Sequence, residues 1–408
     1  MNLMYLKIQD KTIMIFNSKE SFFKILDNNL LPYNLRDNII DTSNMENITA
    51  DIINTNAYAL FDFFSNRGLS INRENAKFIL NQLGISQKND FETKNKMMLL
   101  CKGLSACDDY WITDNENEKW KDVNVRDNPI NNSIAQIALF GKSLNITGII
   151  RTPELTGQGK FAKAWFRENG KLYLLKASSK GGNETEREVQ TSNLIDCFNV
   201  PQVKYKLVHK EGRSLSQCEL LNNSDFSIVD AWEVETWCKK CNKDFLSLVQ
   251  KLDSDTFYKT IIVDYLCSNI DRHGGNWGFF MNNKTGSLIC LHPLFDHNNC
   301  FDIDFMKDET GGVCQLILGK SQKEAALYAI KHCDFRCTKT VTKDMFLDND
   351  MYESFMDRAC ILGLYKKQKL SIFDKLFHLK EQYIPVEIKD NNTSEYWDKV
   401  KSSLENIK

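Results

Sequence analysis

The chain has 408 residues, of which 42% are hydrophobic and 26% are charged, and its formal net charge is −2. This composition is typical of a globular protein with enough apolar material for two or three domains. The charge does not indicate bulk electrostatic attraction to nucleic acid or to acidic membranes, although a local basic patch is compatible with it.

The opening stretch, MNLMYLKIQDKTIMIF, is interrupted by Lys7, Asp10 and Lys11, so it does not resemble a signal peptide. No part of the sequence is apolar over the length that a bilayer requires. The 13 cysteines are scattered along the chain, which is typical of reduced cytosolic thiols. We therefore expect a cytoplasmic protein that makes no use of a membrane.

The region before residue 145 predicts a mixed segment of helices and strands. One or two strands are expected over 1–15, a short helix over 18–29, and a helix over 72–84 that ends at a glycine. Residues 106–129 are polar and rich in turn residues, and they predict an irregular linker or docking strap. None of these patterns indicates what the segment does.

The pattern changes after this segment. Residues 159–178 predict two strands joined at Asn169-Gly170, a dipeptide that favours a tight hairpin turn. A helix with acidic residues in its first turns is expected over 183–198, and a further strand from residue 201 onward. Together these elements predict an antiparallel sheet accompanied by a helix.

The later part of the chain predicts mostly helices, over 254–269, 321–333 and 371–384. A β-rich half followed by an α-rich half favours an α+β fold with two lobes, an antiparallel-sheet N-lobe and a helical C-lobe. We expect an N-terminal α/β segment at 1–145, the N-lobe at 146–222 and the C-lobe at 223–408.

The most informative stretch is SNIDRHGGNWGFF, residues 268–280. Asp271 follows the end of a predicted helix, and Asn276 lies five residues further on. The next residues predict a hairpin with the turn NNKTG, which delivers Asp296 at the end of its second strand. A helix end, a loop and a returning strand thus supply three side chains for one site.

Phosphoryl transfer requires this set of groups. One carboxylate orients and deprotonates the attacking hydroxyl, while an asparagine and a second carboxylate bind magnesium through oxygen atoms. The spacing of Asp271 and Asn276 is that of a kinase catalytic loop. Alternatively, DRHGGN is a polar turn in which Gly274 and Gly275 serve only the backbone geometry. For the hexapeptide alone the two interpretations are about equal, and Asp296 favours the first.

A kinase also needs a cation for the phosphates. Lys176 ends the apolar strand KLYLLKAS, where burying a charge is costly without a partner. Among the acidic residues of the following helix, Glu188 is favoured over Glu184 and Glu186 because it lies further into the helix. Taken alone, Lys176 is more simply the solvated end of a strand.

The hairpin begins at LTGQGKFAKAW, in which Gly157 and Gly159 would let backbone N–H groups approach phosphates. Two glycines in a turn are usually explained by the turn alone. The order of the parts is more informative: a Gly-rich turn, a strand lysine, a helix glutamate, the Asp–x4–Asn loop and a final aspartate.

These residues resemble the HipA-like serine/threonine kinases of bacteria and phages, and more distantly the phosphatidylinositol-kinase catalytic loop. The resemblance rests on NIDRHGGNWGFF, LICLHPLFDHN, LYLLKAS and NETEREVQTSNLI, and it covers residues 150–380. It implies a protein-kinase fold that uses ATP and Mg²⁺.

Carried over by position, the resemblance makes Asp271 the catalytic base and makes Asn276 and Asp296 the magnesium ligands. Lys176 would contact the phosphates, with Glu188 as its partner. Further cofactor-binding positions lie in the Gly-rich turn, in the hinge and in the loop: Gly157, Gln158, Gly159, Lys160, Glu219, Leu220, Leu221 and His273. For His273 the expected role is support of the loop.

The sequence departs from the family at two places. Asp296 is followed by HNN, so there is no Asp-Phe-Gly motif, and the turn TGQGKF is short. Kinases of this type can phosphorylate a hydroxyl in that turn, which makes Thr156 and Thr152 candidate sites of autophosphorylation. The pair Cys238 and Cys241 lacks the second pair that structural zinc normally requires.

The sequence therefore predicts a serine/threonine protein kinase, and family analogy suggests the toxin of a toxin–antitoxin or phage-defence system. Its partners would be a protein substrate with a serine or threonine hydroxyl and a small DNA-binding antitoxin. We expect neither membrane binding nor direct binding of nucleic acid. The alternatives are a pseudokinase that serves as an ATP-binding interaction module, and a kinase that acts on a lipid or small-molecule hydroxyl.

Overall fold

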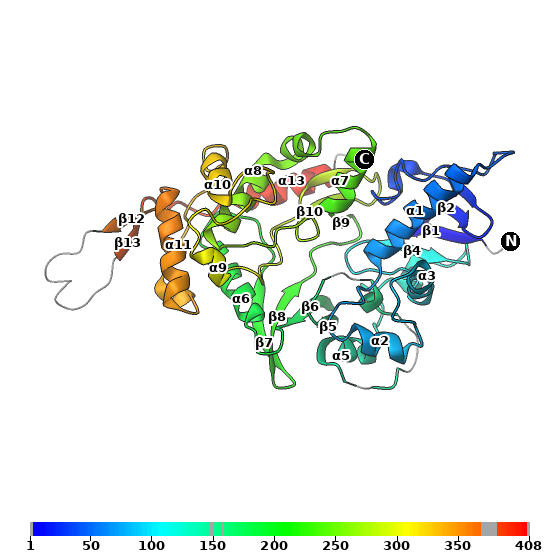
Figure 1. The fold of residues 1–408 in the computed structure, drawn as a ribbon, viewed down its shortest axis with the longest axis horizontal. Coiled ribbons are helices and arrows are strands. Elements are labelled where there is room, and N and C mark those ends of the chain that lie inside the picture. Colours follow the sequence, from blue (N-terminus) through cyan, green and yellow to red (C-terminus); the bar gives the residue numbers. More distant parts are fainter. Residues whose placement is uncertain (1–2, 143, 147–150, 157–158, 369–381, 406–408) are drawn as a thin grey trace. The chain divides into compact units, whose positions relative to one another are not determined.

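A computed structural model describes residues 3–142, 144–146, 151–156, 159–368 and 382–405. It combines helices with antiparallel sheets, as the sequence predicts (Figure 1).

The chain packs into two compact units that are interleaved in sequence. Unit 1 contains Met1–Gly182, Val208–Phe245 and Gly278–Ile289. Unit 2 contains Asn183–Leu207, Leu246–Trp277 and Cys290–Lys408. These units group residues by packing, so the expected division at residues 145 and 222 stays a prediction.

The first sheet of unit 1 has the strand order β3-β2-β1-β4. Its strands are β1 (Met4–Ile8), β2 (Lys11–Asn17), β3 (Phe22–Ile25) and β4 (Tyr110–Thr113), and every neighbouring pair is antiparallel. The strands expected near the N-terminus are therefore confirmed.

The helix expected over 18–29 is wrong, because strand β3 occupies its centre. Phe23 lies opposite Phe16 in the β2–β3 pair, and their rings stack with centroids 6.2 Å apart. Both side chains are buried, so the cross-strand contact outweighs the helical spacing of the local apolar residues.

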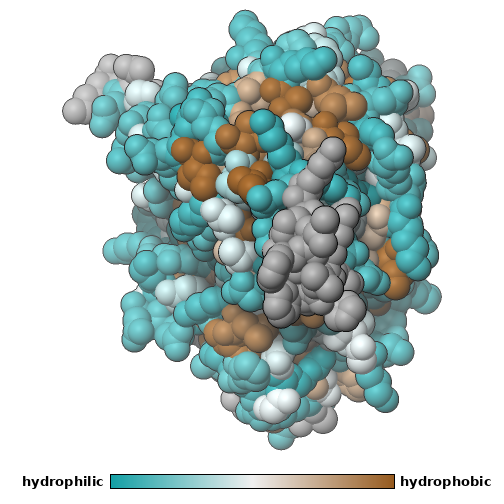
Figure 2. Space-filling model, turned by 90° about the vertical axis from the view of Figure 1, so that its left-hand side faces the viewer, coloured by the Kyte–Doolittle hydropathy of each residue, from teal (hydrophilic) through white to brown (hydrophobic). Residues whose placement is uncertain are grey.

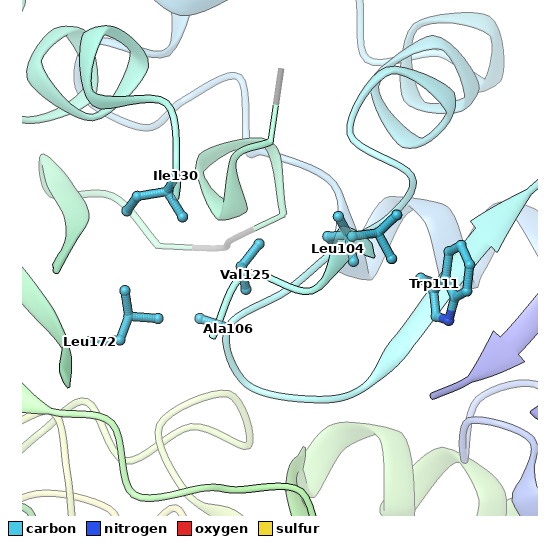
Figure 3. Packing of buried hydrophobic residues seen from close by; sticks show 7 residues of the cluster. Leu104, Ala106, Trp111, Val125, Ile130 and Leu172 are labelled. Atoms are coloured by element: carbon cyan, nitrogen blue, oxygen red, sulfur yellow. The ribbon is translucent and has the colours of Figure 1, made fainter. Parts of the chain in front are cut away.

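The segment 106–129, expected to be an irregular linker or docking strap, is only partly irregular. This segment contains β4 and the short helix α4 (Trp120–Val123), and Trp111 is fully buried. It contributes most of a hydrophobic cluster (Figure 3), whose buried members are Leu104, Ala106, Trp111, Val123, Val125, Ile130 and Leu172. Turn residues flank β4 on both sides, and for this reason its short strand pattern was not recognised in the sequence.

Four helices of unit 1 follow or separate these strands. They are α1 (Ala50–Arg67), α2 (Ala76–Gln82), α3 (Phe91–Leu100) and α5 (Asn132–Phe140). Helix α2 confirms the core of the helix expected over 72–84, and Gly84 follows it with a φ of 60°.

The second sheet has the order β5-β6-β8-β7, with β5 (Lys163–Glu168), β6 (Lys171–Ala177), β7 (Tyr205–Lys210) and β8 (Arg213–Glu219). The turn at residues 169–170 joins β5 to β6 and has φ values of 50° and 80°, as a tight hairpin requires. The expected hairpin is therefore confirmed.

A third sheet has the order β11-β10-β9. It consists of β9 (Phe226–Asp230), β10 (Gly278–Asn282) and β11 (Leu288–Leu291), and helix α7 (Ala231–Lys240) follows β9 directly. The pairing of β10 with β11 confirms the hairpin expected after the DRHGGN motif.

In unit 2, helix α6 (Glu184–Ile195) confirms the helix expected over 183–198. Helix α8 (Phe245–Leu266) has a break at Asp253, where φ is −161° and ψ is 71°. The Asp253 carboxylate accepts a hydrogen bond from the backbone N–H of Thr256 at 3.4 Å, so it caps the second part of the helix. That part contains the helix expected from residue 254.

The remaining elements follow the DRHGGN loop and the β10–β11 hairpin. They are α9 (Ile303–Met306), α10 (Gln322–Ala329), α11 (Asn349–Ile361), β12 (Tyr365–Gln368), β13 (Gln382–Pro385) and α13 (Ser394–Glu405). Helix α10 confirms the helix expected over 321–333. The helix expected over 371–384 is wrong at its end, which belongs to β13, and its other residues lie outside the described ones.

On the face shown in Figure 2, hydrophilic residues surround several smaller hydrophobic patches. Among the residues that the structure describes, no helix has both the length and the hydrophobicity needed to cross a membrane.

Candidate active site

The Asp271 carboxylate lies in the loop between helix α8 and strand β10, where two asparagine side chains bind it. The Asn299 amide donates to Asp271 Oδ2 at 2.7 Å. The Asn276 amide donates to the Asp271 backbone carbonyl at 2.8 Å and approaches Oδ2 at 3.4 Å. Because the nitrogen of Asn276 is used in this way, its oxygen is the atom that can ligate a cation.

Arg272 connects the loop to the strand that returns from the hairpin. Its guanidinium donates to the carbonyl of Asn276 at 2.7 Å and to that of Phe295 at 2.6 Å. Phe295 directly precedes Asp296, so one side chain fixes both segments that carry the predicted magnesium ligands. The structure thus places Asp271, Asn276 and the chain at Asp296 in one part of unit 2.

The charge of Arg272 is balanced by Asp264 on helix α8. The two side chains are 2% and 6% exposed, and the nearest nitrogen and oxygen atoms are 3.0 Å apart. Burial acts to lower the pKa of Arg272, but the Asp264 carboxylate raises it on balance. Burial raises the pKa of Asp264 despite Arg272. Sequence reasoning missed this pair, since Asp264 occupies an apolar helix that gives no sign of a partner.

Asp296 has a left-handed backbone conformation, with a φ of 59°. Its backbone N–H donates to the hydroxyl of Tyr205 at 3.2 Å. Non-glycine residues adopt this conformation at a cost, and such residues gather at functional sites. Aspartate is among the residue types that tolerate it best.

His273 makes two hydrogen bonds within the loop, and its expected role as a support of the loop stays a prediction. Its Nδ1 accepts a hydrogen bond from the backbone N–H of Gly275 at 3.1 Å, and its backbone carbonyl accepts from the N–H of Asn276 at 2.8 Å. The other ring nitrogen lies 3.8 Å from Asp271 Oδ1.

Two glutamines hold the loop from the segment after α9. The Gln322 amide donates to the carbonyl of Asn269 at 2.6 Å, and the Gln315 amide donates to that of Ile270 at 2.5 Å. Both carbonyls lie just before Asp271, so two hydrogen bonds hold the backbone that leads into this residue.

Lys176 lies in β6 of unit 1, opposite Lys163 of β5 and Ser216 of β8, and it is 7% exposed. Glu188 lies in α6 of unit 2 and is fully buried. The expected pairing of Lys176 with Glu188 stays a prediction.

The Gly-rich turn is described only in part, because Gly157 and Gln158 lie outside the described residues. Gly159 and Lys160 are exposed. Residues on either side of Gly157 and Gln158 are held by the N-terminal segment. The backbone N–H of Leu69 donates to the carbonyl of Leu155 at 2.9 Å, and the backbone N–H of Glu74 donates to the carbonyl of Lys160 at 2.8 Å.

A buried ion pair strengthens this attachment. Arg73 lies 3.3 Å from Glu154, and the two side chains are 1% and 2% exposed. Glu154 also accepts from the backbone N–H of Trp165 at 2.7 Å, and Arg73 donates to the carbonyl of Lys163. Residues of the N-terminal segment therefore position the turn and the start of β5, a role that the sequence did not reveal.

The two candidate sites of autophosphorylation are buried in this conformation. The Thr156 hydroxyl donates to the carbonyl of Leu104, and the Thr152 hydroxyl accepts from the backbone N–H of Glu154 at 3.1 Å. Either hydroxyl would have to leave its bonds before it could accept a phosphate.

The expected hinge follows β8. Glu219 is its last residue and pairs with Lys171 at 2.7 Å. The backbone N–H of Leu220 donates to the carbonyl of Leu172 at 3.1 Å, so this N–H is already used, and the expected contact with adenine stays a prediction. Leu221 is half-buried.

No cluster of three or more His, Cys, Asp and Glu side chains is placed to hold a metal among the described residues. The predicted ligands, the oxygen of Asn276 and the carboxylate of Asp296, fit magnesium nonetheless. This ion is usually bound by one or two protein oxygens together with substrate phosphates and water.

The described sheets, helices and catalytic-type loop together form a HipA-like fold, which confirms the expected resemblance at the level of the fold. One structure that is similar over nearly the whole chain is HipA of Shewanella oneidensis MR-1, in a toxin–antitoxin complex with HipB and operator DNA. It has a TM-score of 0.50 at 12% identity and covers 99% of this chain and 97% of that one. The expected two-lobe arrangement stays a prediction.

A second similar structure is the proinflammatory kinase CtkA of Helicobacter pylori. Its TM-score is 0.36 at 16% identity, and it covers 55% of this chain and 86% of that one. No protein-family model and no curated protein sequence matches the chain.

Proposed function

We propose that this protein is an ATP- and Mg²⁺-dependent serine/threonine protein kinase of the HipA-like type. The observation that carries the proposal is the geometry around Asp271. Its carboxylate is oriented by Asn299, while Arg272 holds Asn276 and the chain at Asp296 in fixed positions. The HipA-like fold supports the same class of reaction.

In the proposed reaction, Asp271 aligns the acceptor hydroxyl for in-line attack and takes its proton. Asn276 and Asp296 hold magnesium, which when bound neutralises charge on the phosphates. Lys176 and the turn before β5 hold the phosphate chain. The segment after β8 would contact adenine through its backbone.

We further propose that the protein is the toxin of a toxin–antitoxin or phage-defence system. The HipA of Shewanella oneidensis was found with HipB and operator DNA, and its similarity to this chain extends over 99% of the residues. A small DNA-binding antitoxin is therefore the partner we propose.

The central test is phosphate transfer from labelled ATP with magnesium. Purified wild type is compared with Asp271→Ala and Asp296→Ala, and with the matched control Asp398→Ala, which removes an exposed carboxylate from helix α13 of the same unit. We expect label on protein in the wild type and in the control, and none with the other two variants.

The acceptor is identified by offering bacterial lysate protein, lipid vesicles and small metabolites separately. Label on lipid or metabolite alone would replace the protein-kinase proposal with that of a kinase for those hydroxyls. ATP binding without transfer to any acceptor would favour a pseudokinase. Absence of nucleotide binding would overturn the proposal.

A further inference from the structure

The last residue of strand β11, Leu291, is held by side chains at both of its backbone groups. Its N–H donates to Asp253 Oδ2 at 3.2 Å, and its carbonyl accepts from the hydroxyl of Tyr396 at 2.6 Å. Among the described strands β11 lies at the edge of its sheet, so side chains can take the place of a further strand there. Leu291 is buried, and a buried backbone group without a partner costs about 1–3 kcal/mol.

Tyr396 belongs to helix α13, whose buried face is small. Among the described residues of this helix, Tyr396 and Val400 are the buried ones, and their spacing of four places them on one face. Burial raises the pKa of Tyr396 well above its ordinary value, so its hydroxyl stays protonated and donates. A helix with so small a buried face depends on specific polar contacts for its place.

A second contact of α13 reaches the same two elements. The Lys399 ammonium donates to the carbonyl of Leu252, and its Nζ lies 3.7 Å from Asp253 Oδ1. Burial raises the pKa of Asp253, while Lys399 acts in the opposite direction. Lys399 thus favours the charged form of the carboxylate that accepts the N–H of Leu291. Helix α13 therefore holds Leu291 in two ways, directly through Tyr396 and indirectly through Lys399.

Leu291 precedes Asp296 by five positions, and the chain between them is held as well. The N–H of Leu294 donates to the carbonyl of Pro201 at 3.0 Å, and its carbonyl accepts from the N–H of Val203 at 2.8 Å. The left-handed backbone of Asp296 costs about 1–2 kcal/mol and persists only where the surrounding structure enforces it. The anchors at Leu291 and Leu294 enforce it on the approach to Asp296. Loosening one of them would let Asp296 relax and turn its carboxylate away.

We propose that helix α13 positions Asp296 for magnesium and that Tyr396 is the positioning residue. The proposal rests on the proposed kinase function, in which Asp296 is a magnesium ligand, and it gives α13 a part in the site that no motif of the sequence indicated. Tyr396 acts through the backbone of Leu291, 105 residues earlier in the chain. Removing its hydroxyl should weaken the binding of magnesium with ATP and spare the binding of ATP alone.

The test measures the affinity for ATP by calorimetry, once with excess Mg²⁺ and once with EDTA in place of the metal. The ratio of the two affinities is the magnesium effect, which reports metal binding apart from activity. In Tyr396→Phe one hydrogen bond is lost, so the magnesium effect should fall roughly 2- to 10-fold. The affinity in EDTA should stay as in the wild type, since Tyr396 is not a proposed nucleotide contact.

Tyr365→Phe is the matched control. The Tyr365 hydroxyl accepts a hydrogen bond from the backbone N–H of Val341 at 2.9 Å, in the same unit, and Tyr365 is buried. This variant loses a comparable bond, so its melting temperature should fall by a similar amount while its magnesium effect stays that of the wild type. Lys399→Met should lower the magnesium effect as Tyr396→Phe does. Thermal melting shows which variants are folded, and Lys399→Met decides if Tyr396→Phe is not.

A double variant tests whether Tyr396 acts through Asp296. Asp296→Ala should lower the magnesium effect more strongly than Tyr396→Phe, because it removes a proposed ligand. Adding Tyr396→Phe to Asp296→Ala should lower the effect no further, since the carboxylate that Tyr396 positions is already absent.

The outcomes separate this inference from the kinase proposal. An unchanged magnesium effect in Tyr396→Phe, an equal fall in Tyr365→Phe, or additive losses in the double variant would overturn the role of Tyr396 while leaving the kinase proposal intact. A wild type that binds no nucleotide, or that binds ATP without any magnesium effect, would overturn both.

Discussion

The side-chain amide of Asn299 donates a hydrogen bond to Oδ2 of Asp271 at 2.7 Å. This contact joins the loop after helix α8 to the segment three residues beyond Asp296. One oxygen of the Asp271 carboxylate is thereby held in place. In the proposed reaction, the other oxygen would accept the proton of a substrate hydroxyl.

Replacing Asn299 tests this relationship. In Asn299→Ala the Asp271 carboxylate loses a hydrogen bond to a charged group, and we expect kcat to fall roughly 10- to 100-fold. The KM for ATP should change little, since Asn299 orients the base and does not hold the nucleotide. Steady-state kinetics would show this split, with the exposed Asn391→Ala as the control. An unchanged kcat would argue against an orienting role.

The buried pair of Arg272 and Asp264 should be essential for the stability of unit 2. Removing one partner leaves an uncompensated buried charge, so Arg272→Gln should cost about 3–5 kcal/mol of unfolding free energy. The double variant with Asp264→Asn should lose less than the sum of the single losses. Urea unfolding measures these values.

The matched control for this pair is Lys367→Ala. Lys367 and Asp357 form an ion pair in the same unit, 2.9 Å apart, but their side chains are 43% and 51% exposed. Exposed pairs contribute about 1 kcal/mol or less. If the Arg272 and Lys367 variants lost equal stability, the argument from burial would be wrong.

The Arg73–Glu154 pair should link stability to nucleotide binding in unit 1. Arg73→Met leaves Glu154 buried without its partner and should cost about 3–5 kcal/mol. Arg73 also donates to the carbonyl of Lys163, the first residue of β5, which directly follows the turn proposed to hold the phosphates. The affinity for ATP should therefore fall together with stability. Urea unfolding and ATP titration on the same samples would show this, with the exposed pair partner Lys142→Ala as control. A stable variant with normal ATP affinity would refute the proposed link.

Sequence predicted those features that depend on neighbouring residues. Asn169-Gly170 predicted its hairpin because the positive φ values of the turn are a local property. The relation of Asp271 to Asn276 follows from a five-residue spacing. Asn299 was missed because its contact spans 28 residues and depends on how the returning strand folds.

Features that depend on distant partners could not be predicted. Trp111 lies in a strand that pairs with β1, so its register partner Lys7 is about a hundred residues away. Arg73 and Glu154 are separated by 81 residues. Nothing in either local sequence distinguishes these charges from ordinary surface charges.

Two carboxyl groups on and beside helix α7 should make the stability of unit 1 depend on pH. Burial raises the pKa of Asp230 to about 7 and that of Glu233 to about 8. Each group binds its proton more tightly when folded, so its stabilising contribution is complete at low pH and is lost as the pH rises through these values. The melting temperature should therefore fall between about pH 5 and about pH 8.5.

Asp230→Asn and Glu233→Gln should reduce this pH dependence. Neutral amides imitate the protonated carboxyls, so the melting temperatures of the variants should exceed that of the wild type by much less near pH 5 than near pH 8.5. Circular dichroism at both pH values provides the measurement, and Asp114→Asn in the same unit is the exposed control. A parallel pH dependence in wild type and variants would contradict the assignment.

Gly286 should tolerate no side chain. Its φ is 70°, and an added Cβ atom would lie 1.9 Å from the carbonyl oxygen of Asn29. Gly170 has a φ of 80° with open space around it, so Gly170→Ala measures backbone strain alone, about 1–2 kcal/mol. Gly286→Ala should cost clearly more in urea unfolding. Equal losses would show that the hairpin turn does not pack against the N-terminal segment as described.

The carbonyl of Gly286 accepts hydrogen bonds from Tyr33 and Arg36, at 3.0 Å each. In the sequence, Tyr33 lies 253 residues and Arg36 lies 250 residues before Gly286. At a synthesis rate of about 5–20 residues per second, the ribosome would therefore make Tyr33 and Arg36 on the order of 10–50 seconds before it makes Gly286. The contacts of Tyr33 and Arg36 with Gly286 cannot form until the last segment of unit 1, Gly278–Ile289, has left the ribosome. This delay favours assistance by a chaperone that covers the apolar surface of the N-terminal segment during that time.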